Sequence, residues 1–327
     1  MLESSSSIRV SDDELMKKAK ELIAVERYLE AARHLREVQD MTKLTTQFRH
    51  ALLWADEMES RLKREREGAF VAHGWKKQGE AHANYDFVTY HKVDLNNRLT
   101  VRIELILESS MVVPLLAVLN ETNLYSEWMP SWKHPRVGLR QSKMLHEFGR
   151  GNQIVQVTVD MPFPIATREV VQHAVSIDAI EEAAAILIRV KDLPPGYFDD
   201  DINIPEPAKG AVRIDFDAGI VIRACPEDHD LLKRSKRKYP ENEHKVLVTI
   251  EKSIDAHVSY VPVSIINFFT RQVIKQMLVS LLDVARDIQT GKREKHAAAI
   301  QAKEELYGWV TKRVESLFAK FGSGSKD

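Results

Sequence analysis

Side chains that could carry out chemistry are few in this sequence and form no catalytic pattern. The chain has twelve histidines, but they show no metal-ligand spacing, and no HExxH, CxxC or GxSxG motif occurs. Gly149, Arg150 and Gly151 begin a glycine pattern, but Ile154 stands where a dinucleotide fingerprint needs its third glycine, so we interpret the segment as a hairpin turn. The one cysteine, Cys225, is interpreted as a small buried hydrophobe. These residues predict no metal, no cofactor and no catalytic group.

The composition is ordinary for a soluble protein. The 327 residues are 44% hydrophobic and 29% charged, which allows one large or two modest cores. The formal net charge of -1 gives no overall field to attract nucleic acid, so nucleic acid is not expected as a partner. The single cysteine allows no intrachain disulfide, residues 1–14 lack the apolar core of a signal peptide, and no apolar run approaches a membrane span. We therefore expect a cytoplasmic protein.

One long helix, from Val261 to Ile288, is the element that must position a site. Pro262 suits its first turn, and Gly291 suits its C-terminal stop. At about 1.5 Å per residue the helix is about 40 Å long, enough to cross a small domain. Apolar residues recur in it at spacings of three and four, which predicts one broad buried face. That face consists of Ile266, Thr270, Val273, Met277, Leu281, Val284 and Ile288, broadened by Phe269, Leu278, Leu282 and Ala285.

Between residues 68 and 259 the period is mostly that of antiparallel strands. Pro162 and Pro164 cannot donate ladder bonds, so the strand that precedes them must leave the sheet and carry Phe163 and Ile165 into a loop. Residues 111–133 interrupt the strands with a helical pattern. Expected strands cover residues 69–79, 84–94, 98–109, 139–148, 152–161, 169–178, 183–192 and 244–259, and residues 210–226 are expected to form a tight hairpin or a bulged strand pair.

Helical segments are expected on both sides of the strands. Residues 1–67 predict a helical hairpin, capped at Ser11 or Asp12, followed by a third helix from residue 43. Residues 292–327 predict an amphipathic helix with a flexible tail. This helix is expected to pack on the N-terminal helices rather than insert into a membrane, because those helices also need a partner. Its apolar stripe is Leu306, Trp309, Val310, Val314, Leu317 and Phe321.

The central part of the chain, residues 68–291, resembles the START family, the steroidogenic acute regulatory protein-related lipid-transfer domains. The resemblance covers about two-thirds of the chain and implies an α+β helix-grip fold, in which a curved antiparallel sheet closes around its C-terminal helix. Between the two, the family has a tunnel for one lipid. The matching segments, in order, are LYSEWMPSW at 124–132, PFPIATREVV at 162–171, AVRIDF at 211–216 and VPVSIINFFTRQVIKQML at 261–278.

The resemblance also implies a ligand site. The loop from Pro162 to Ile165 matches the family's mobile loop at the tunnel mouth, and the long helix is the lid. Arg168 matches an arginine that often points its charge into the tunnel, although Glu169 replaces the usual aspartate. The expected ligand-binding residues are Tyr125, Trp128, Val157, Phe163, Ile165, Arg168, Asn267, Phe269, Thr270, Val273 and Met277.

The family's phosphocholine-binding pattern is missing. Members that hold this head group use an arginine and an aspartate around the tryptophan matched by Trp128, together with aromatic side chains near the mouth. The matching positions here are Tyr125, Met129, Val157 and Val170, which provide neither the charge pair nor an aromatic cage for a cation. This disfavours a choline lipid and leaves a sterol, a fatty acid or another phospholipid as the expected ligand.

Three functions follow as hypotheses. The preferred one is non-enzymatic lipid binding and transfer, with transient contact with a membrane surface. The second is a lipid-responsive adaptor that meets a protein partner through residues 1–67 or 292–327. The third is a helix-grip cyclase or hydrolase, which would need Asp160, Arg168 and His173 to converge in the tunnel. The basic run at 233–238 is interpreted as a solvated loop rather than a lipid contact.

Overall fold

A computed structural model of the chain describes residues 10–67, 74–93, 99–133, 137–163, 165–194, 198–199, 202–255 and 263–321, and only the backbone of residues 67, 93, 99, 198–199, 263–272 and 321. The helices are α1 (Asp12–Ile23), α2 (Tyr28–Arg36), α3 (Thr46–Glu67), α4 (Val112–Asn120), α5 (Ile180–Ala183), α6 (Asp230–Arg234), α7 (Val263–Gln289), α8 (Glu294–Ala302) and α9 (Glu304–Phe321), with 3-10 helices η1 (Met41–Lys43), η3 (Ser109–Met111) and η4 (Thr122–Glu127). The strands are β1 (Lys76–Ala81), β2 (Asp86–Val93), β3 (Leu99–Glu108), β4 (Gly138–Glu147), β5 (Asn152–Asp160), β6 (Thr167–Ala179), β7 (Ala185–Asp192), β8 (Phe198–Asp199), β9 (Ile202–Asn203), β10 (Ala211–Arg213), β11 (Asp215–Ala224) and β12 (Lys245–Asp255).

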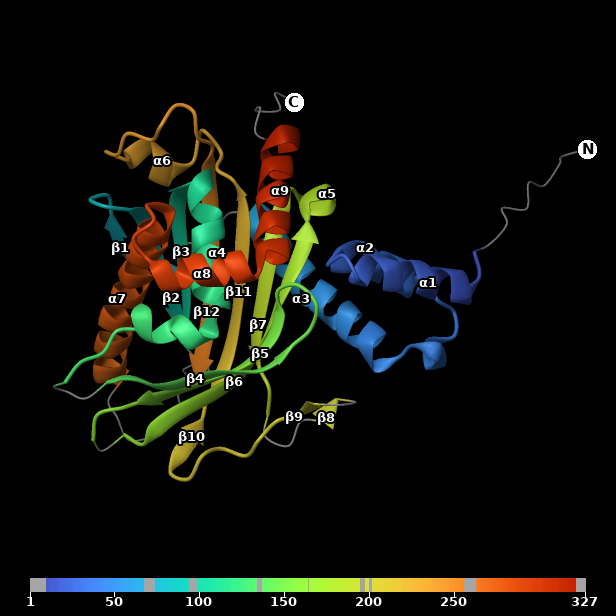
Figure 1. The fold of residues 1–327 in the computed structure, drawn as a ribbon, viewed down its shortest axis with the longest axis horizontal. Helices are drawn as coiled ribbons and strands as arrows, with labels where there is room; N and C mark the ends of the chain where they lie inside the picture. The colour runs from blue at the N-terminus through green and yellow to red at the C-terminus, as the bar shows by residue number, and fades with distance from the viewer. Residues whose placement is uncertain are drawn as a thin grey trace, which may run out of the picture.

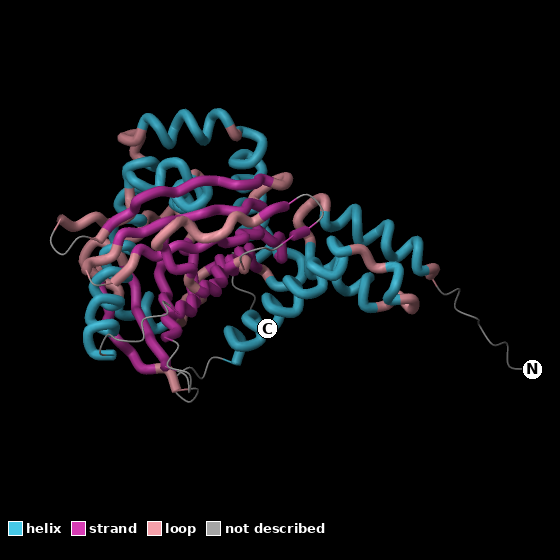
Figure 2. The backbone as a smooth tube through the Cα atoms, turned by 90° about the horizontal axis from the view of Figure 1, so that it is seen from below, coloured by secondary structure: helices cyan, strands magenta, loops and turns pink. Residues whose placement is uncertain are grey.

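A single large antiparallel sheet organises these elements, which confirms the predicted α+β class (Figure 1). The strand order is β1-β2-β3-β12-β11-β7-β6-β5-β4, so the last strand of the chain lies in the middle, between β3 and β11. Figure 2 shows the sheet as a curved band of strands with helices at its sides. The curvature gives the sheet an inner face, which α7 covers together with α4 and α9, and an outer face, on which the N-terminal helices pack.

The expected hairpin at residues 210–226 is wrong. Instead, β10 pairs in parallel with the start of β6, and β11 pairs with β7 and β12. The reason lies in the length of β7, which ends at Asp192 opposite Gln172. The Leu193 N–H still donates to the Val171 carbonyl at 2.8 Å, but residues 167–170 of β6 have no partner from β7. The chain fills this open edge with β10 before it enters β11, and the Ile214 N–H donates to the Glu169 carbonyl at 2.9 Å.

Helix α7 confirms the predicted long helix and ends where the sequence indicates. Gly291 has a φ of 73°, a left-handed conformation in which a side chain would be strained, and its N–H donates to the Ile288 carbonyl at 3.0 Å. The described part of its apolar face packs into the main core with the inner face of the sheet. The residues of α7 buried there are Ile274, Leu278, Leu281, Leu282, Val284 and Ala285.

The expectation that the C-terminal helix packs on the N-terminal helices is wrong. Val310, Val314, Leu317 and Phe318 of α9 belong to the same core as α7 and the inner face of the sheet. Helix α9 contacts α4, α5, α8 and β11, and Figure 1 shows it beside α4 over the strands. The physical reason is that α7 covers only part of the inner face, so α4 and α9 must cover the rest.

The N-terminal helices instead cover the outer face of the sheet. Val175, Ile177 and Leu187 project from β6 and β7 into a second core with the apolar faces of α1, α2 and α3. Trp54 of α3 meets the His173 ring edge to face, with centroids 5.1 Å apart. Burial lowers the pKa of His173 to about 3, so this ring is a neutral packing group under the helices.

Buried ion pairs hold α3 to the other half of the outer face. Arg102 of β3 is only 1% exposed, and its Nη2 donates to Glu65 Oε2 of α3 at 2.9 Å. Its Nε donates to Glu104 Oε1 of the same strand at 2.9 Å. A guanidinium with two carboxylate partners is satisfied in this position, whereas its removal takes the nearest cation from two buried carboxylates.

We therefore expect Arg102→Met to lower the free energy of unfolding by roughly 3–5 kcal/mol, because it leaves the buried Glu65 with only Arg223, 3.8 Å away, and the buried Glu104 with only His229, 3.7 Å away. Equilibrium urea unfolding of the full chain measures this change. The control is Arg36→Met, which removes an exposed arginine that pairs with Asp56 and Glu59, and which should cost less than about 1 kcal/mol. Equal effects of the two variants would show that the Arg102 cluster does not anchor α3.

Candidate ligand cavity

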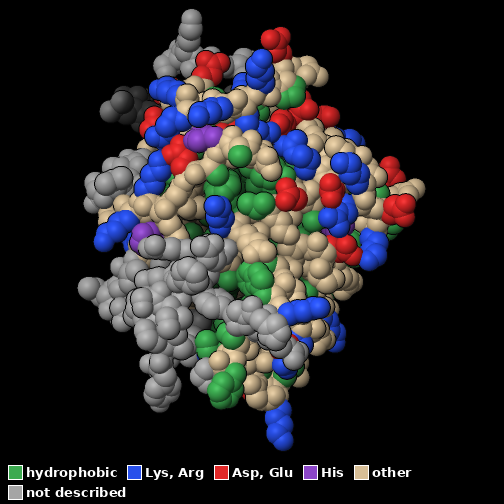
Figure 3. Space-filling view, turned by 90° about the vertical axis from the view of Figure 1, so that its left-hand side faces the viewer, with side chains coloured by type: hydrophobic (Ala, Val, Ile, Leu, Met, Phe, Trp, Pro, Cys, Tyr) green, Lys and Arg blue, Asp and Glu red, His purple; other side chains and the backbone are tan. Residues whose placement is uncertain are grey.

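A cavity of about 490 Å³ lies between the inner face of the sheet and the helices that cover it. Its walls come from β3–β7, β11 and β12, from η4 and from α4, α7 and α9. This volume lies within the range of about 300–1,000 Å³ that is usual for small-molecule sites. The space-filling view in Figure 3 shows the face with β1 and α7, on which apolar side chains reach the surface in patches among charged ones.

Strand alternation explains why so many apolar side chains reach the cavity. Successive side chains of a strand point to opposite faces, so every second residue of a central strand lines the wall. On β5 the lining residues are Gln153, Val155, Val157 and Val159, and Gly151 just before the strand continues the series. On β6 they are Arg168, Val170, Gln172, Ala174 and Ser176, and the residues between them face the N-terminal helices or other outer packing.

An aromatic pair from η4 and the residue after it forms part of the wall. The rings of Tyr125 and Trp128 lie edge to face with centroids 5.3 Å apart, and both side chains are 8% exposed. The Tyr125 hydroxyl donates to the Leu119 carbonyl at 2.7 Å, and burial raises the pKa of this tyrosine above its ordinary value. Trp128 Nε1 is buried without a hydrogen-bond acceptor among the described residues, so it is a donor available to a ligand.

Two cationic side chains line the cavity. Arg168 is 8% exposed at the start of β6, where its Nη1 donates to the Ala166 carbonyl at 2.8 Å, and burial lowers its pKa. Lys252 of β12 lies among apolar side chains, and burial lowers its pKa to about 8. Glu169, next to Arg168, points away and pairs with Arg213 at 2.8 Å. No Asp or Glu lines the cavity within the described parts of the chain.

Most of the expected ligand-binding residues with described side chains lie in the cavity wall. These are Tyr125, Trp128, Val157, Arg168, Val273 and Met277. Phe163 and Ile165 are not among the described lining residues, so their part in ligand binding stays a prediction; the Ile165 N–H donates to the Pro162 carbonyl at 2.8 Å. Phe163 is 99% exposed. The side chains of Asn267, Phe269 and Thr270 lie outside the described part of α7, so their roles stay predictions.

The four positions matched to a phosphocholine site, Tyr125, Met129, Val157 and Val170, all line the cavity. The residues proposed for an enzyme do not come together. Asp160 pairs with Arg140 at 2.5 Å, Arg168 lines the cavity, and His173 faces Trp54 on the outer side of the sheet. No acid-base group therefore forms from these three residues.

Several wall residues were not predicted from the sequence. Leu306, Tyr307 and Val310 come from α9, which was expected elsewhere. Lys252 was missed although the pattern contains it: Val246, Val248, Ile250 and Ile254 share its strand phase, so it stands in an otherwise apolar series. Gln153 was also missed; its Nε2 donates to the carbonyl of Asn120 at 3.2 Å and helps to join β5 to α4.

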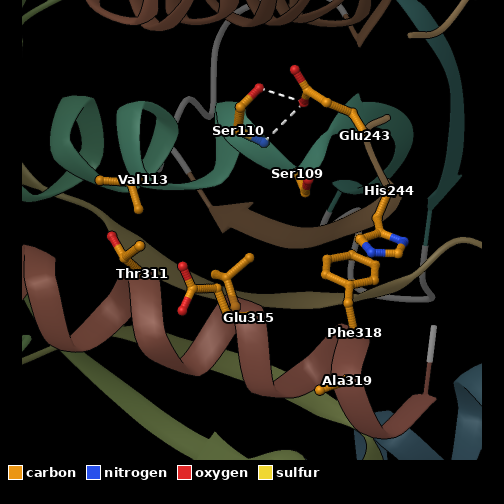
Figure 4. A pocket seen from close by; sticks show the side chains of 10 residues that line it. Ser109, Ser110, Val113, Glu243, His244, Thr311, Glu315, Phe318 and Ala319 are labelled. Atoms are coloured by element: carbon orange, nitrogen blue, oxygen red, sulfur yellow. Dashed lines mark hydrogen bonds between the residues drawn. The ribbon is translucent and has the colours of Figure 1, made fainter. Parts of the chain in front are cut away.

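A second pocket, of about 820 Å³, lies between η3, α4, the segment before β12 and α9 (Figure 4). In it the Ser110 hydroxyl donates to Glu243 Oε2 at 2.5 Å. The His244 ring stacks on Phe318 with centroids 4.4 Å apart. Because the serine is bonded to a carboxylate and the histidine is stacked on a phenyl ring, the described side chains form no serine–histidine pair here.

In the described ranges no group of three or more His, Cys, Asp or Glu side chains is placed to hold a metal ion. Over the same ranges no helix is both long and apolar enough to cross a bilayer.

Comparison of the sequence with protein-family models and with curated proteins finds no match. Comparison of the fold does find likenesses, to solved structures of STAR-related lipid-transfer proteins. These structures belong to the family that the sequence resembles.

Three of these structures illustrate the likeness. A STAR-related lipid transfer protein from Xanthomonas axonopodis is 18% identical, with a TM-score of 0.45, over 65% of this chain and 99% of that chain. Human StAR-related lipid transfer protein 5 is 13% identical, with a TM-score of 0.49, over 73% and 97%. Human STARD10 is 16% identical, with a TM-score of 0.49, over 73% and 82%. At these low scores the function must be inferred from the cavity itself.

The position of Lys252 predicts a stability that depends on pH. Since burial lowers its pKa from 10.5 to about 8, the unfolded chain binds the proton more tightly than the folded protein does. The free energy of unfolding of lipid-free protein should therefore rise by roughly 1–3 kcal/mol as pH goes from about 8 to 10.5. Lys252→Met should lack this part of the rise, which urea unfolding across that pH range measures. The same pH profile in both proteins would contradict a buried lysine.

The position of Met277 predicts that the cavity can be filled from α7. Met277→Trp should weaken uptake of a fluorescent fatty acid by about tenfold or more, because the larger side chain occupies ligand space and overpacking costs about 1–3 kcal/mol. Gln276→Trp is the matched control, since Gln276 is exposed on the same helix. Undiminished uptake by Met277→Trp would mean that this face of α7 is packed core.

Proposed function

We propose that this protein binds one lipid in the cavity between the sheet and α7 and transfers it between membranes without catalysing a reaction. The observation that carries the proposal is the enclosed wall of alternating apolar side chains under the helices α4, α7 and α9. Burial of a lipid chain in such a wall is favourable by about 0.8 kcal/mol per methylene group. The few polar groups in the wall would orient the head group.

The loop before β6 is the part of this site that would meet a membrane. Phe163 is fully exposed at its tip, while Met161 and Arg168 on either side of the loop line the cavity. An exposed aromatic side chain at the mouth of an apolar cavity can enter the headgroup region of a bilayer, where aromatic rings are favoured. Lipid exchange would then take place at this end of the strands.

The basic segment at 233–238 lies at the other end of the sheet. The segment follows the end of β11, where Arg223 lies opposite Ala185 at the start of β7. Ala185 in turn lies opposite Ala179, the last residue of β6. The loop of Phe163 precedes Thr167, the first residue of β6, and so lies at the opposite end of that strand. In Figure 3 Lys and Arg side chains gather among acidic ones toward the top, the end at which Figure 1 places α6. Arg234 pairs with Glu80 at 3.0 Å and Arg237 with Glu108 at 2.8 Å, which supports the interpretation of a solvated, internally paired segment.

The direct test of the proposed function combines native mass spectrometry with a transfer assay. The full chain should carry a lipid of cellular origin after purification under non-denaturing conditions, and lipid extraction would identify it. The purified protein should also raise the rate at which labelled lipid moves from donor to acceptor vesicles. A protein that carries no lipid and leaves the transfer rate unchanged would refute the proposal.

The loop predicts a specific transfer defect. Phe163→Asp should slow vesicle-to-vesicle transfer by about tenfold or more, because a carboxylate at the loop tip opposes insertion into the bilayer. The melting temperature should stay within error of the wild type, since the side chain is 99% exposed. Leu53→Asp, at an exposed apolar position of α3, is the control and should transfer normally. An equal loss in both variants would remove the loop from the mechanism.

A second candidate, a lipid-responsive adaptor, is favoured by a chain of ion pairs that joins the cavity wall to the N-terminal helices. Arg313 of α9 pairs with Asp178 at 2.7 Å, and Lys320 pairs with Glu181 of α5. Glu182 of α5 pairs with Arg27, just before α2, at 2.9 Å. A partner bound to α1–α3 could in this way sense the position of α9.

The two candidates differ in what charge reversal at this link does. Glu182→Lys should leave vesicle transfer unchanged if transfer alone is the function, because Glu182 does not line the cavity. If the protein is an adaptor, the wild type should capture a partner only when it is loaded with lipid. The Glu182→Lys variant should then capture the same partner equally with and without lipid. Binding of the same partners with and without lipid by the wild type would eliminate the adaptor.

A further inference from the structure

Lys252 places a positive charge inside an otherwise apolar part of the cavity. Its neighbours in the same strand phase are Ile250 and Ile254, and the residues opposite it are Ala218 on β11 and Val101 on β3. The side chain is enclosed by protein, and it keeps accessible surface because it lines the cavity. Among the described residues, no hydrogen bond or ion pair of the Lys252 ammonium group is formed.

The cavity wall supplies no negative charge to compensate. Its titratable side chains, within the described parts of the chain, are Lys252, Arg168, Tyr125 and Tyr307. Both tyrosines are neutral donors: the Tyr125 hydroxyl bonds to the Leu119 carbonyl, and the Tyr307 hydroxyl bonds to Glu121 Oε1 at 2.5 Å. Burial raises the pKa of each tyrosine, so neither becomes an anion near neutral pH. The described wall therefore carries two cations and no anion.

The two cations lie at different depths. Across the sheet Lys252 is in register with Ala218, then Val190, then Ala174 of β6. Arg168 precedes Ala174 by six residues on the same strand, which at about 3.3 Å per residue is about 20 Å toward the Phe163 loop. A single head group therefore cannot contact both side chains, and Lys252 is the inner of the two.

We infer that the lipid held by this cavity has a negatively charged head group, a carboxylate or a phosphate, which ion-pairs with Lys252 inside the protein. This inference rests on the proposed function and specifies its ligand class. An ammonium group in apolar surroundings is costly unless an anion or a set of acceptors reaches it. A neutral sterol or alcohol leaves it uncompensated, whereas an anionic lipid brings the missing charge together with an apolar chain for the wall.

The orientation follows from the same positions. The head group lies inward at Lys252, and the chain runs along the apolar residues of β5, β6 and α7. Arg168, nearer the mouth, is placed to attract the anion as it passes from the membrane into the cavity. The charge of Arg168 raises the rate at which the lipid enters, as charges near an opening do, whereas the charge of Lys252 stabilises the bound lipid.

The test compares lipids that differ only in the head group. Full-length, delipidated protein is titrated at pH 7 with oleate, oleyl alcohol, oleoyl lysophosphatidate and cholesterol, and affinities are measured by displacement of a neutral fluorescent lipid probe. Oleate should bind at least about tenfold more tightly than oleyl alcohol, since a close buried charge pair contributes that much or more. The order of oleate and lysophosphatidate identifies the head group as carboxylate or phosphate, and a preference for either supports the inference.

Variants assign the preference to Lys252. Lys252→Met, of similar length and without charge, should bind oleate and oleyl alcohol with nearly equal affinity. Lys252→Arg keeps the charge and should retain the preference for the anion. The matched control is Lys143→Met on β4, where the lysine is exposed, and it should behave as the wild type. Retention of the tenfold preference in Lys252→Met would overturn the assignment.

The pH dependence gives a second readout. Burial lowers the pKa of Lys252 to about 8, so the ammonium group of the empty protein loses its proton above that pH. The preference for oleate over oleyl alcohol should then decline between pH 8 and 10 in the wild type and should be absent at every pH in Lys252→Met. The other titratable wall groups in the described residues, Arg168 and the two tyrosines, are present in both proteins and cancel in this comparison.

The outcomes separate this inference from the proposed function. If none of the four lipids binds, the proposed function fails and the inference fails with it. If cholesterol or oleyl alcohol binds as tightly as oleate, lipid binding stands and the anionic head group is refuted. If the anions are preferred and Lys252→Met loses the preference, both stand.

Discussion

The strict alternation of side chains along the central strands is the constraint on which the rest of this structure depends. Because neighbouring residues point to opposite faces, each of these strands must satisfy two environments at once. On β6, Val170 and Ala174 face the cavity while Val171 and Val175 are buried on the outer side. A shift of one residue in register would exchange the cavity-facing and the outward-facing side chains. The same register therefore determines both the cavity wall and the surface on which the N-terminal helices pack.

The outer face therefore supports the cavity although none of its side chains lines it. Helix α3 is fixed there by apolar contacts at one side and by the Arg102 and Glu65 pair at the other. These contacts fix the strands through their outer face. Part of the inner face can then remain uncovered by side chains, because the strands do not move inward to fill the cavity. Close-packed interiors rarely keep space of this size, so a cavity needs rigid surroundings on its far side.

Periodicity in the sequence predicted the elements well and their partners less well. The long helix, the strands and the proline loop depend on local patterns, and the structure has them near the expected residues. The place of α9 and the parallel pairing of β10 depend on which surface remains uncovered after the other elements have packed, and local patterns do not contain that information. Lys252 could have been singled out from the sequence, since it interrupts an apolar series on β12. Only the structure, however, shows that this lysine lines the cavity.

The contribution of α9 to the cavity wall has a consequence for how the protein is made. Leu306, Tyr307 and Val310 close one side of a chamber whose other walls are formed by earlier parts of the chain. Domains fold as the chain leaves the ribosome from its N-terminal side, so the sheet emerges while this side of the chamber is still open. During synthesis this apolar wall therefore stays exposed until α9 docks, and the chamber closes only at that step.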